Sequence, residues 1–433
     1  GIPAALDGVR MDGVALIEKL NALNGSSSLA LGTLYGAGTK LQQAAGIQDS
    51  PQGLLEYFLA RGGDKLDFEI QKFCADHFGE TIDWLSGELG VPFVSTVSIK
   101  GTDTVPRGHN LDSNATVALN AVEGLAQKNG VEFHFLTTAS SLVTDGSNAV
   151  VGVVAKNHAG EYVEYRAGKV IMASGGFCRN AEMIDQYCPD YKGVYTEVGL
   201  GCTGEGLAMG LDIGADYIGH GGTNGILACA VSAGQSKLIN TKALWVDASG
   251  KRFVNEGGQT HDIYYQVAHF PNQDFYAVYD QAMVDALDAQ LRNQFDLGME
   301  MGIFAKGDTV AAAAQALKID GAAAEESLSA YNALVATGSD SQFGKSARLL
   351  TPITKAPFYL LTLGVCTHGS FGGYRVNTNF QALDTKGDPI ANLYAIGEVS
   401  SGTFIYEDYP SGGCGLNWSY TSGRYAGAHA AGA

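Results

Sequence analysis

Short runs of apolar residues recur along the chain, and several of them are followed by a glycine or a charged residue. Runs of this length are typical of strands that are buried within a sheet. They predict strands at 14–17, 131–136, 170–173, 243–246, 275–279 and 393–396. Two further runs, 150–155 and 162–165, are separated by His158-Ala159-Gly160 and are expected to form a hairpin.

Other segments carry apolar residues at helical spacing. Residues 51–89 repeat leucine, isoleucine and phenylalanine in this way, and 322–335 is rich in alanine. We also expect a loop that leads into a terminal helix after 412. The alternation of strands and helices indicates an α/β fold. Because the middle of the chain differs from the rest in its sequence pattern, we expect one domain at 1–214 and 369–433, with a second domain at 215–368 inserted into it.

Glycine is in excess, with 58 of 433 residues, about 13 %, against a usual value of roughly 7 %. The glycines show no collagen period and no low-complexity clustering. We therefore expect them in turns and at places where the backbone closely approaches a large cofactor.

The charge balance is acidic: 27 Lys and Arg against 45 Asp and Glu give a net charge of −18. This argues against nucleic acid or an anionic membrane surface as a partner, and no window has the apolar length of a membrane span. The seven cysteines are scattered without metal-ligand spacing, so neither a metal site nor a disulfide framework is expected. No signal peptide is visible, so we expect a soluble protein, cytoplasmic, or periplasmic if the N-terminus is truncated.

The strand expected at 14–17 ends in an acid, Glu18. In a dinucleotide-binding βαβ unit, an acid at the end of the second strand accepts hydrogen bonds from an adenosine ribose. Gly1 then stands where the last glycine of the phosphate loop is expected, and the first strand would precede this chain. The alternative is a surface strand that ends in glutamate by coincidence.

Two other predicted strands run into glycine turns. Ala173-Ser174-Gly175-Gly176 follows the first, and Gly397-Glu398 follows the second. A turn without side chains lets a cofactor lie against bare backbone. Each turn by itself is also compatible with an ordinary loop, but their order in one chain favours a dinucleotide cofactor.

These motifs together resemble an FAD-dependent flavoprotein family that includes soluble fumarate reductases, urocanate reductase, succinate dehydrogenase flavoprotein subunits and 3-ketosteroid dehydrogenases. The resemblance covers nearly the whole chain. The motifs that carry it are Ile17-Glu18-Lys19, Gly25-Ser26-Ser27, the turn at Gly32, Ala173-Ser174-Gly175-Gly176-Phe177, Thr203-Gly204-Glu205-Gly206, Arg252-Phe253-Val254-Asn255-Glu256, Ala356-Pro357-Phe358-Tyr359, Gly372-Gly373, Leu393-Tyr394-Ala395-Ile396-Gly397-Glu398 and Gly423-Arg424-Tyr425-Ala426-Gly427. It implies a Rossmann-like FAD-binding domain with an inserted α+β cap (clamp) domain, and non-covalent FAD as the cofactor.

The resemblance also implies which residues bind the cofactor. They are Gly1, Glu18, Lys19, Ser26, Ser27, Gly32, Ala139, Ala173, Ser174, Gly175, Gly176, Thr203, Glu205, Glu398, Gly413, Gly415, Leu416 and Asn417. Glu18 and Lys19 would bind the adenosine ribose, and Glu398 would contact the ribityl chain. Gly415 to Asn417, at a helix N-terminus, would face the N1/O2 edge of the flavin, where a helix dipole stabilises negative charge.

The substrate clamp of fumarate reductases is not reproduced in this sequence. Arginines and histidines suit a dicarboxylate because each carboxylate accepts a bidentate cation. Here Asp408-Tyr409-Pro410-Ser411 contains no arginine, and His261 takes the place of the arginine that follows the Asn-Glu motif. His368 is what remains of the paired histidine. The loss of this cationic clamp argues against fumarate or succinate.

The stretch Tyr409-Pro410-Ser411-Gly412-Gly413 instead resembles the ketosteroid dehydrogenase arrangement, in which a tyrosine and a nearby serine or backbone donor polarise a substrate carbonyl. A hydroxyl donor stabilises the charge that develops on oxygen when hydride attacks the β-carbon. His261, Tyr264 and Tyr265 are candidates for proton transfer at the α-carbon. The predicted catalytic residues are therefore Tyr409, Ser411, His261 and Tyr265. The alternative roles are a loop aromatic for Tyr409, a turn serine for Ser411, a surface histidine or helix cap for His261, and core packing for Tyr264 or Tyr265.

The sequence thus predicts an FAD-dependent oxidoreductase acting on CH–CH groups. It would reduce, or form by dehydrogenation, a C=C bond conjugated to a carbonyl in a small enone or ketosteroid-like molecule, with hydride passing through FAD N5. A fumarate- or urocanate-type carboxylate reductase is the alternative, and a non-catalytic or incomplete flavoprotein-fold subunit is a second. The sequence does not identify the electron donor or acceptor.

Overall fold

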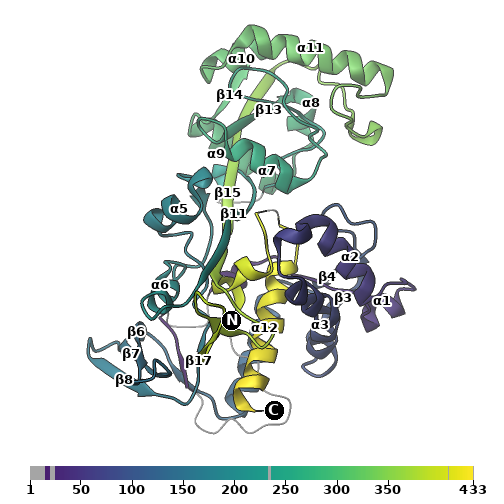
Figure 1. Cartoon of the computed structure of the whole chain (residues 1–433). Helices are drawn as coiled ribbons and strands as arrows, with labels where there is room; N and C mark the ends of the chain where they lie inside the picture. Colours follow the sequence, from purple (N-terminus) through teal and green to yellow (C-terminus); the bar gives the residue numbers. More distant parts are fainter. Residues whose placement is uncertain (1–14, 20–24, 233–235, 408, 433) are drawn as a thin grey trace. The chain divides into compact units, whose positions relative to one another are not determined.

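The computed structural model describes residues 15–19, 25–232, 236–407 and 409–432. These residues divide into two compact units. The first unit comprises the described residues within Gly1–Lys192, Val198–Asn224 and His368–Ala433. The second comprises those within Gly193–Glu197 and Gly225–Thr367. Two long strands, β11 (Tyr217–Ala228) and β15 (Phe358–Tyr374), continue from one unit into the other (Figure 1). The domain boundaries expected from the sequence stay predictions.

Small sheets form the frame of the first unit. Its strands are β1 (Ala15–Ile17), β2 (Thr33–Tyr35), β3 (Phe93–Ser98), β4 (Gly108–Leu111), β5 (Glu132–His134), β6 (Thr138–Thr144), β7 (Val150–Lys156), β8 (Tyr162–Arg166), β9 (Val170–Met172), β16 (Gln381–Leu383) and β17 (Pro389–Ala395). β1 pairs in parallel with β5, and β9 pairs in parallel with β17. The strands expected around 14–17, 131–136, 170–173 and 393–396 correspond to these four, and the expected hairpin is β7–β8.

Except for α4, whose N-cap residue is Ala115, the helices of the first unit begin at polar caps or glycines that the sequence supplies. They are α1 (Lys40–Ala44), α2 (Pro51–Gly62), α3 (Phe68–Gly87), α4 (Thr116–Lys128), α5 (Ala181–Tyr187), α6 (Glu205–Leu211) and α12 (Cys414–Ala431). The segment 51–89 forms two helices, because Gly63 takes the left-handed conformation with φ 59° and Asp67 caps a new helix with its carboxylate.

One apolar cluster fixes α12 within the first unit. Leu34 of β2, Ile82 of α3, Leu111 of β4 and Val122 of α4 are buried there together with Tyr420 of α12. Burial of large side chains from five elements stabilises their mutual packing. The N-terminal end of α12 is therefore held against β2.

The second unit is built on the antiparallel pairing of β13 (Asp274–Asp280) with both β12 (Leu244–Val246) and β15. Its other elements are α7 (Thr260–Ala268), α8 (Gln281–Asp285), α9 (Ala289–Glu300), α10 (Val310–Ala316), α11 (Gly321–Thr337), β10 (Tyr195–Thr196) and β14 (Phe304–Gly307). The strands expected at 243–246 and 275–279 and the helix expected at 322–335 are present as β12, β13 and α11. The sequence pattern did not reveal β11 or β15, because their glycines look like turn signals.

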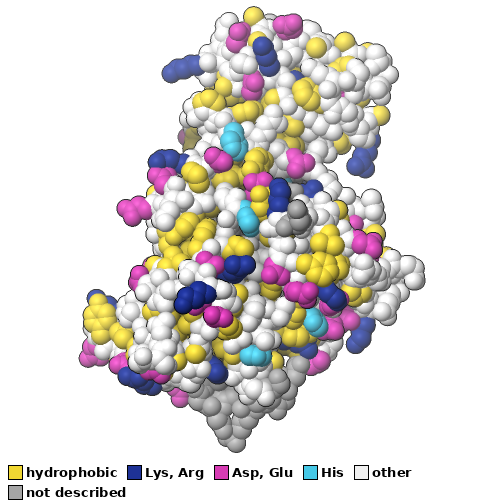
Figure 2. Space-filling view, in the orientation of Figure 1, with side chains coloured by type: hydrophobic (Ala, Val, Ile, Leu, Met, Phe, Trp, Pro, Cys, Tyr) yellow, Lys and Arg dark blue, Asp and Glu magenta, His cyan; other side chains and the backbone are white. Residues whose placement is uncertain are grey.

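The surface carries charges of both signs. On the face drawn in Figure 2, acidic and basic side chains are interspersed, so the net charge of −18 does not form one continuous acidic patch on that face. Among the described residues, no helix has both the length and the apolar character needed to cross a membrane.

A buried ion network lies in the second unit. Nη2 of Arg252 lies 2.8 Å from both Oε2 of Glu256 and Oδ2 of Asp340, and these three side chains are at most 2 % exposed. Nζ of Lys345 lies 3.3 Å from Oε2 of Glu256, and burial lowers the pKa of Lys345 to about 8. Removing one member of such a network leaves an uncompensated buried charge.

We predict that Arg252→Met lowers the free energy of unfolding by about 3–5 kcal/mol, because Glu256 and Asp340 lose their shared cation. Urea denaturation measures this change. The matched control is Lys355→Met, which removes an ion pair with Asp285 whose side chains are 59 % and 51 % exposed; it should cost no more than about 1 kcal/mol. Equal losses in the two variants would contradict the prediction.

Candidate active site

The N-terminus of α12 is placed by a close backbone contact. Gly413 precedes the helix with φ 106°, and a Cβ on it would lie 3.0 Å from both the carbonyl oxygen of Thr33 and the amide nitrogen of Tyr35. Nδ2 of Asn417 donates to the carbonyl oxygen of Tyr35 at 2.8 Å and to that of Phe78 at 3.1 Å. These contacts hold the start of α12 on β2. Gly413, as the N-cap residue, has no side chain to cap the helix, and the helix dipole favours negative charge at this end.

Asn417 and Leu416 have structural roles at this site. Asn417 is fully buried and its amide group already bonds to the backbone of β2 and α3. Leu416 packs against the apolar cluster under α12. Their predicted contact with the flavin edge stays a prediction.

Tyr409 reaches the same helix end. Its hydroxyl accepts a hydrogen bond from the Gly415 amide at 2.7 Å, and its ring stacks on Phe371 with centroids 5.6 Å apart and an interplanar angle of 7°. Burial raises the pKa of the Tyr409 hydroxyl well above its ordinary value. The hydroxyl therefore stays protonated and retains a proton that it can donate.

Ser411 lies two residues further on and is only 2 % exposed. Its hydroxyl oxygen is buried and has no hydrogen-bond partner among the described residues. A buried hydroxyl without a partner is costly. This makes the Ser411 hydroxyl available to a bound molecule.

The ends of β9 and β17 meet at a second part of the site. Because these strands are parallel, their carboxyl ends bring Gly175 and Gly176 beside Glu398. Oε1 of Glu398 accepts hydrogen bonds from the amide of Ser370 at 2.8 Å and from its hydroxyl at 3.3 Å. A Cβ on Gly176 would overlap both this carboxylate oxygen and the Ser370 hydroxyl. Burial raises the pKa of Glu398 despite these donors.

Lys19, Thr203 and Glu205 form one hydrogen-bonded group, although they come from distant segments. Nζ of Lys19 donates to Oγ1 of Thr203 at 3.0 Å and to Oε1 of Glu205 at 2.6 Å. Burial raises the pKa of Glu205, but the hydrogen bonds from Lys19 and Thr203 outweigh it, so the pKa lies below its usual value. Glu18, the residue before Lys19, follows β1 and bonds through its backbone amide to the carbonyl oxygen of His134 at 3.0 Å.

The other predicted cofactor residues lie on loops and strands of the first unit. Oγ of Ser26 accepts from the Gly199 amide at 3.1 Å and lies 3.0 Å from Sγ of Cys202. Gly32 has φ 82° and packs on the backbone of Ala115. The remaining positions are Ser27 in a short turn, Ala139 on β6, and Ala173 and Ser174 directly after β9. Gly1 lies outside the described residues, and all of these cofactor roles stay predictions.

The predicted catalytic residues fall into two pairs, one in each unit. His261 and Tyr265 lie on α7 of the second unit, with ring centroids 6.5 Å apart. Tyr264 is fully buried against Gly225 and has the core position that was its alternative role. Tyr409 and Ser411 belong to the first unit. A joint action of the two pairs on one substrate stays a prediction.

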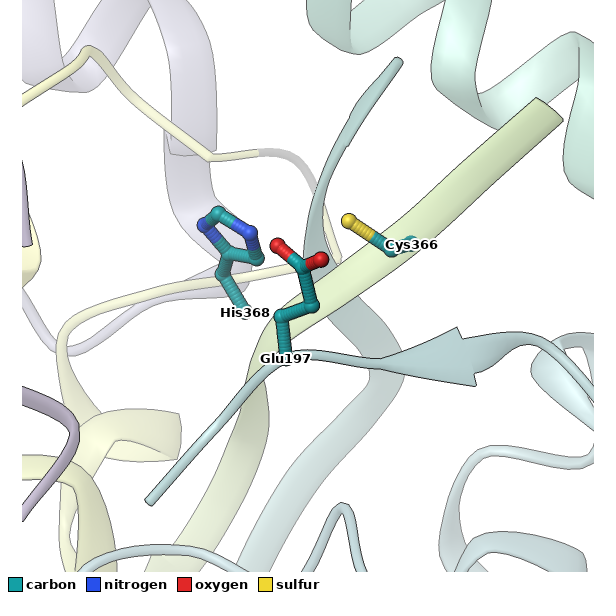
Figure 3. A group of neighbouring side chains, drawn as sticks. All are labelled: Glu197, Cys366 and His368. Atoms are coloured by element: carbon teal, nitrogen blue, oxygen red, sulfur yellow. The ribbon is translucent and has the colours of Figure 1, made fainter. Parts of the chain in front are cut away.

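Figure 3 shows Glu197, Cys366 and His368. Glu197 and Cys366 lie in the second unit, where burial, and then the charge of Glu197, raise the pKa of Cys366 to about 12. The Cys366 thiol therefore stays protonated. His368 follows two residues later on β15 and is the first residue of that segment of the first unit, so we derive no site from the three together.

Sequence reasoning missed three residues near the start of α12. Ser370 fixes Glu398, Tyr57 donates to the carbonyl oxygen of Pro410 at 2.6 Å, and Lys100 approaches Gly412. Ser370 stands close to the Gly372-Gly373 motif, which is a signal that could have found it. Tyr57 and Lys100 carry no comparable signal, because only the folded chain brings them to this end of α12.

The chain matches the family model described as FAD binding domain over residues 1–416, and it therefore belongs to this family. Vinyl phenol reductase of Lactiplantibacillus plantarum is 28 % identical over 475 residues, which cover 100 % of this chain and 94 % of the relative. A flavocytochrome c3 fumarate reductase in its open conformation matches with a TM-score of 0.80 and 26 % identity, over 97 % of this chain and 74 % of that one. The 3-ketosteroid-Δ4-(5α)-dehydrogenase of Rhodococcus jostii matches with a TM-score of 0.79 and 25 % identity, over 96 % and 91 %.

The protein is an FAD-dependent oxidoreductase that acts on CH–CH groups, with the predicted FAD-binding domain and cap domain. Its residues fit the cofactor: the turn at Gly175 and Gly176 offers bare backbone, and the dipole at the start of α12 favours a flavin that gains negative charge. The alternative of a non-catalytic subunit is therefore set aside.

We predict that Gly176→Ala weakens FAD binding at least about tenfold, because the new methyl group displaces Glu398 and Ser370 from the turn. Titration of apoprotein with FAD, followed by flavin fluorescence, measures the dissociation constant. Gly168→Ala is the control, because a Cβ there meets no atom within 4 Å. Unchanged FAD affinity in Gly176→Ala would show that this turn does not contact the cofactor.

His109 has a structural role. It is 1 % exposed; its Nδ1 lies 2.8 Å from the carbonyl oxygen of Arg107, and its Nε2 lies 2.8 Å from Oγ1 of Thr39. With Nδ1 as the donor and Nε2 as the acceptor, the neutral ring satisfies both partners. Burial lowers the pKa of His109 to about 4.

We predict that this histidine makes the protein less stable in mild acid. As the pH falls from the unfolded-state pKa of 6.5 toward 4, His109 binds a proton in the unfolded chain but stays neutral in the folded protein. The loss between about pH 7 and about pH 5 is about 2 kcal/mol. Urea denaturation at both pH values should show a smaller difference for His109→Gln than for the unaltered protein; an equal difference would assign the pH dependence to other groups.

Proposed function

We propose that this oxidoreductase reduces, or forms by dehydrogenation, a C=C bond conjugated to a carbonyl in a neutral enone or ketosteroid-like molecule. The observation that carries the proposal is that two uncharged hydroxyls lie at the start of α12: that of Tyr409, which is neutral, and that of Ser411, which has no hydrogen-bond partner among the described residues. Uncharged donors suit a carbonyl oxygen, whereas a dicarboxylate needs cations on each carboxylate. The likeness to a ketosteroid dehydrogenase at 25 % identity supports the same assignment.

The chemistry of an enone explains why donors are needed at this point. FAD supplies or accepts the hydride. When a hydride adds to the β-carbon, the π electrons shift and negative charge develops on the carbonyl oxygen. The Tyr409 hydroxyl, kept protonated by burial, and the Ser411 hydroxyl would donate to this oxygen. His261 or Tyr265 would exchange the proton at the α-carbon.

A fumarate- or urocanate-type carboxylate reductase is the second candidate. The match to a flavocytochrome c3 fumarate reductase, with a TM-score of 0.80 and 26 % identity, favours it. Against it stands the absence of arginine from the sequence between Glu407 and Gly413. His261, which takes the place of the arginine that follows the Asn-Glu motif, would then be the proton donor.

We predict that enones reoxidise the reduced holoenzyme at least about tenfold faster than fumarate does. The holoenzyme is reduced anaerobically and mixed with 2-cyclohexenone, 4-androstene-3,17-dione, acrylate or fumarate, and the return of oxidised flavin absorbance is followed. Tyr409→Phe should slow the enone reaction about 100-fold, because one donor to the developing oxyanion is lost.

Tyr420→Phe is the matched control, since the Tyr420 hydroxyl, which lies on α12, has no hydrogen-bond partner among the described residues. If fumarate were the fastest acceptor and His261→Ala abolished its reduction, the carboxylate reductase would replace our proposal.

A further inference from the structure

The side chain of Lys100 packs against Gly108 and passes near Gly412, which precedes α12. It lies in the turn between β3 and β4 and is partly buried. A Cβ on Gly108 would lie only 2.6 Å from Cγ and 2.9 Å from Cε of Lys100, and one on Gly412 would lie 4.0 Å from its Cδ. The aliphatic stem thus packs over the backbone of β4 and passes beside the segment that precedes α12. A larger residue at Gly108 would push the stem away.

The Lys100 ammonium has no hydrogen bond or ion pair with any described residue. The acids near its turn are already paired: Asp103 accepts from Nη1 of Arg107 at 2.9 Å and from the Tyr35 hydroxyl, and Asp49 accepts from Nη2 of Arg107 at 2.8 Å. Burial lowers the pKa of Lys100 without an opposing contribution from a nearby carboxylate. A partly desolvated cation without a counter-charge favours binding of an anion.

The unpartnered Ser411 hydroxyl lies beside the same turn. A Cβ on Gly101, the residue after Lys100, would lie 3.2 Å from Oγ of Ser411 and 3.2 Å from the Tyr57 hydroxyl. The Tyr57 hydroxyl already donates to the carbonyl oxygen of Pro410 at 2.6 Å, which leaves Ser411 as a free buried donor in this place. The stem of Lys100, the unpartnered Ser411 hydroxyl and the segment that precedes α12 therefore lie together.

We propose that Lys100 and Ser411 form an oxyanion site that stabilises the enolate oxygen of the substrate. This inference rests on the proposed function and adds a charged residue to its uncharged donors. A neutral carbonyl has little charge to attract a lysine, but the oxygen bears a full negative charge once hydride has added. Lys100 therefore acts on the transition state more than on the bound substrate.

The electron balance of the step shows where the cation is needed. The hydride brings two electrons to the β-carbon and forms a C–H bond, the C=C π pair moves between the α-carbon and the carbonyl carbon, and the C=O π pair moves onto oxygen. The resulting enolate takes a proton at the α-carbon and becomes the saturated ketone. The hydride comes from the reduced flavin of the established activity. Lys100 keeps its protons throughout and contributes only charge and a hydrogen bond.

A phenolate tests the oxyanion site without turnover, because it carries negative oxygen on an sp² carbon as an enolate does. Oxidised holoenzyme is titrated with pentafluorophenolate, and binding is followed by the change in the visible flavin spectrum; pentafluoroanisole is the neutral probe. Lys100→Met should weaken phenolate binding at least about tenfold and leave anisole binding unchanged. Lys100→Arg should retain most of the phenolate affinity.

Lys386→Met is the control, because it removes an exposed lysine from the turn between β16 and β17; its phenolate affinity should equal that of the unaltered protein. Visible absorbance confirms that each variant carries its flavin. If Lys100→Met destabilises the protein, Lys100→Gln repeats the measurement with a polar side chain. Equal phenolate affinity in Lys100→Met and Lys386→Met would overturn the proposal.

Steady-state kinetics distinguish a failure of this inference from a failure of the proposed function. With the best enone of the screen, Lys100→Met should lower kcat about 100-fold with little change in KM. If no enone reacts but phenolate binding depends on Lys100, the proposed substrate class is wrong and the oxyanion site stands. If enones react equally well with and without Lys100, the proposed function stands and the role of Lys100 is refuted.

Discussion

The close approach of α12 to β2 sets the geometry on which the rest of the first unit depends. Gly413 permits it, because any Cβ there would press on the backbone of Thr33 and Tyr35. Asn417 then uses its buried amide to join the helix to β2 and α3. A helix dipole acts on a bound group only where the end of the helix is fixed in place. This end of α12 is fixed, although its Gly415 amide already donates to the Tyr409 hydroxyl.

The second constraint comes from two parallel strands that end side by side. β9 and β17 bring a glycine turn and an acid together, although more than two hundred residues separate them in the chain. Ser370 holds the Glu398 carboxylate against Gly176 with its amide and its hydroxyl. The arrangement leaves bare backbone beside an oriented acid. This combination suits the polar chain of a dinucleotide cofactor better than it suits packing alone.

The ion pairs of the described residues bear on the proposed preference for a neutral substrate. Arg107 is committed to Asp49 and Asp103 and lies in a buried network of the scaffold. In the second unit, Arg252 is likewise committed to Glu256 and Asp340. These arginines stabilise the fold, while Lys100 lacks any such partner among the described residues. A single cation with neutral donors matches one oxygen atom of a substrate, and a pair of carboxylates would need more.

The sequence by itself determined the class of fold and several elements, because these depend on local patterns, and its resemblance to a flavoprotein family implied FAD as the cofactor. The strands before Glu18, Ser174 and Gly397 could be predicted from short apolar runs, as could the alanine-rich helix α11. The glycine-rich strands β11 and β15 could not, since long-range pairing overrides local turn signals there. The break at Gly63 depends on a positive φ that helical periodicity does not reveal. Only the tertiary structure decided that Lys100, Tyr57 and Ser411 meet at the start of α12. Their proximity depends on packing between segments some three hundred residues apart, which no periodicity along the chain encodes.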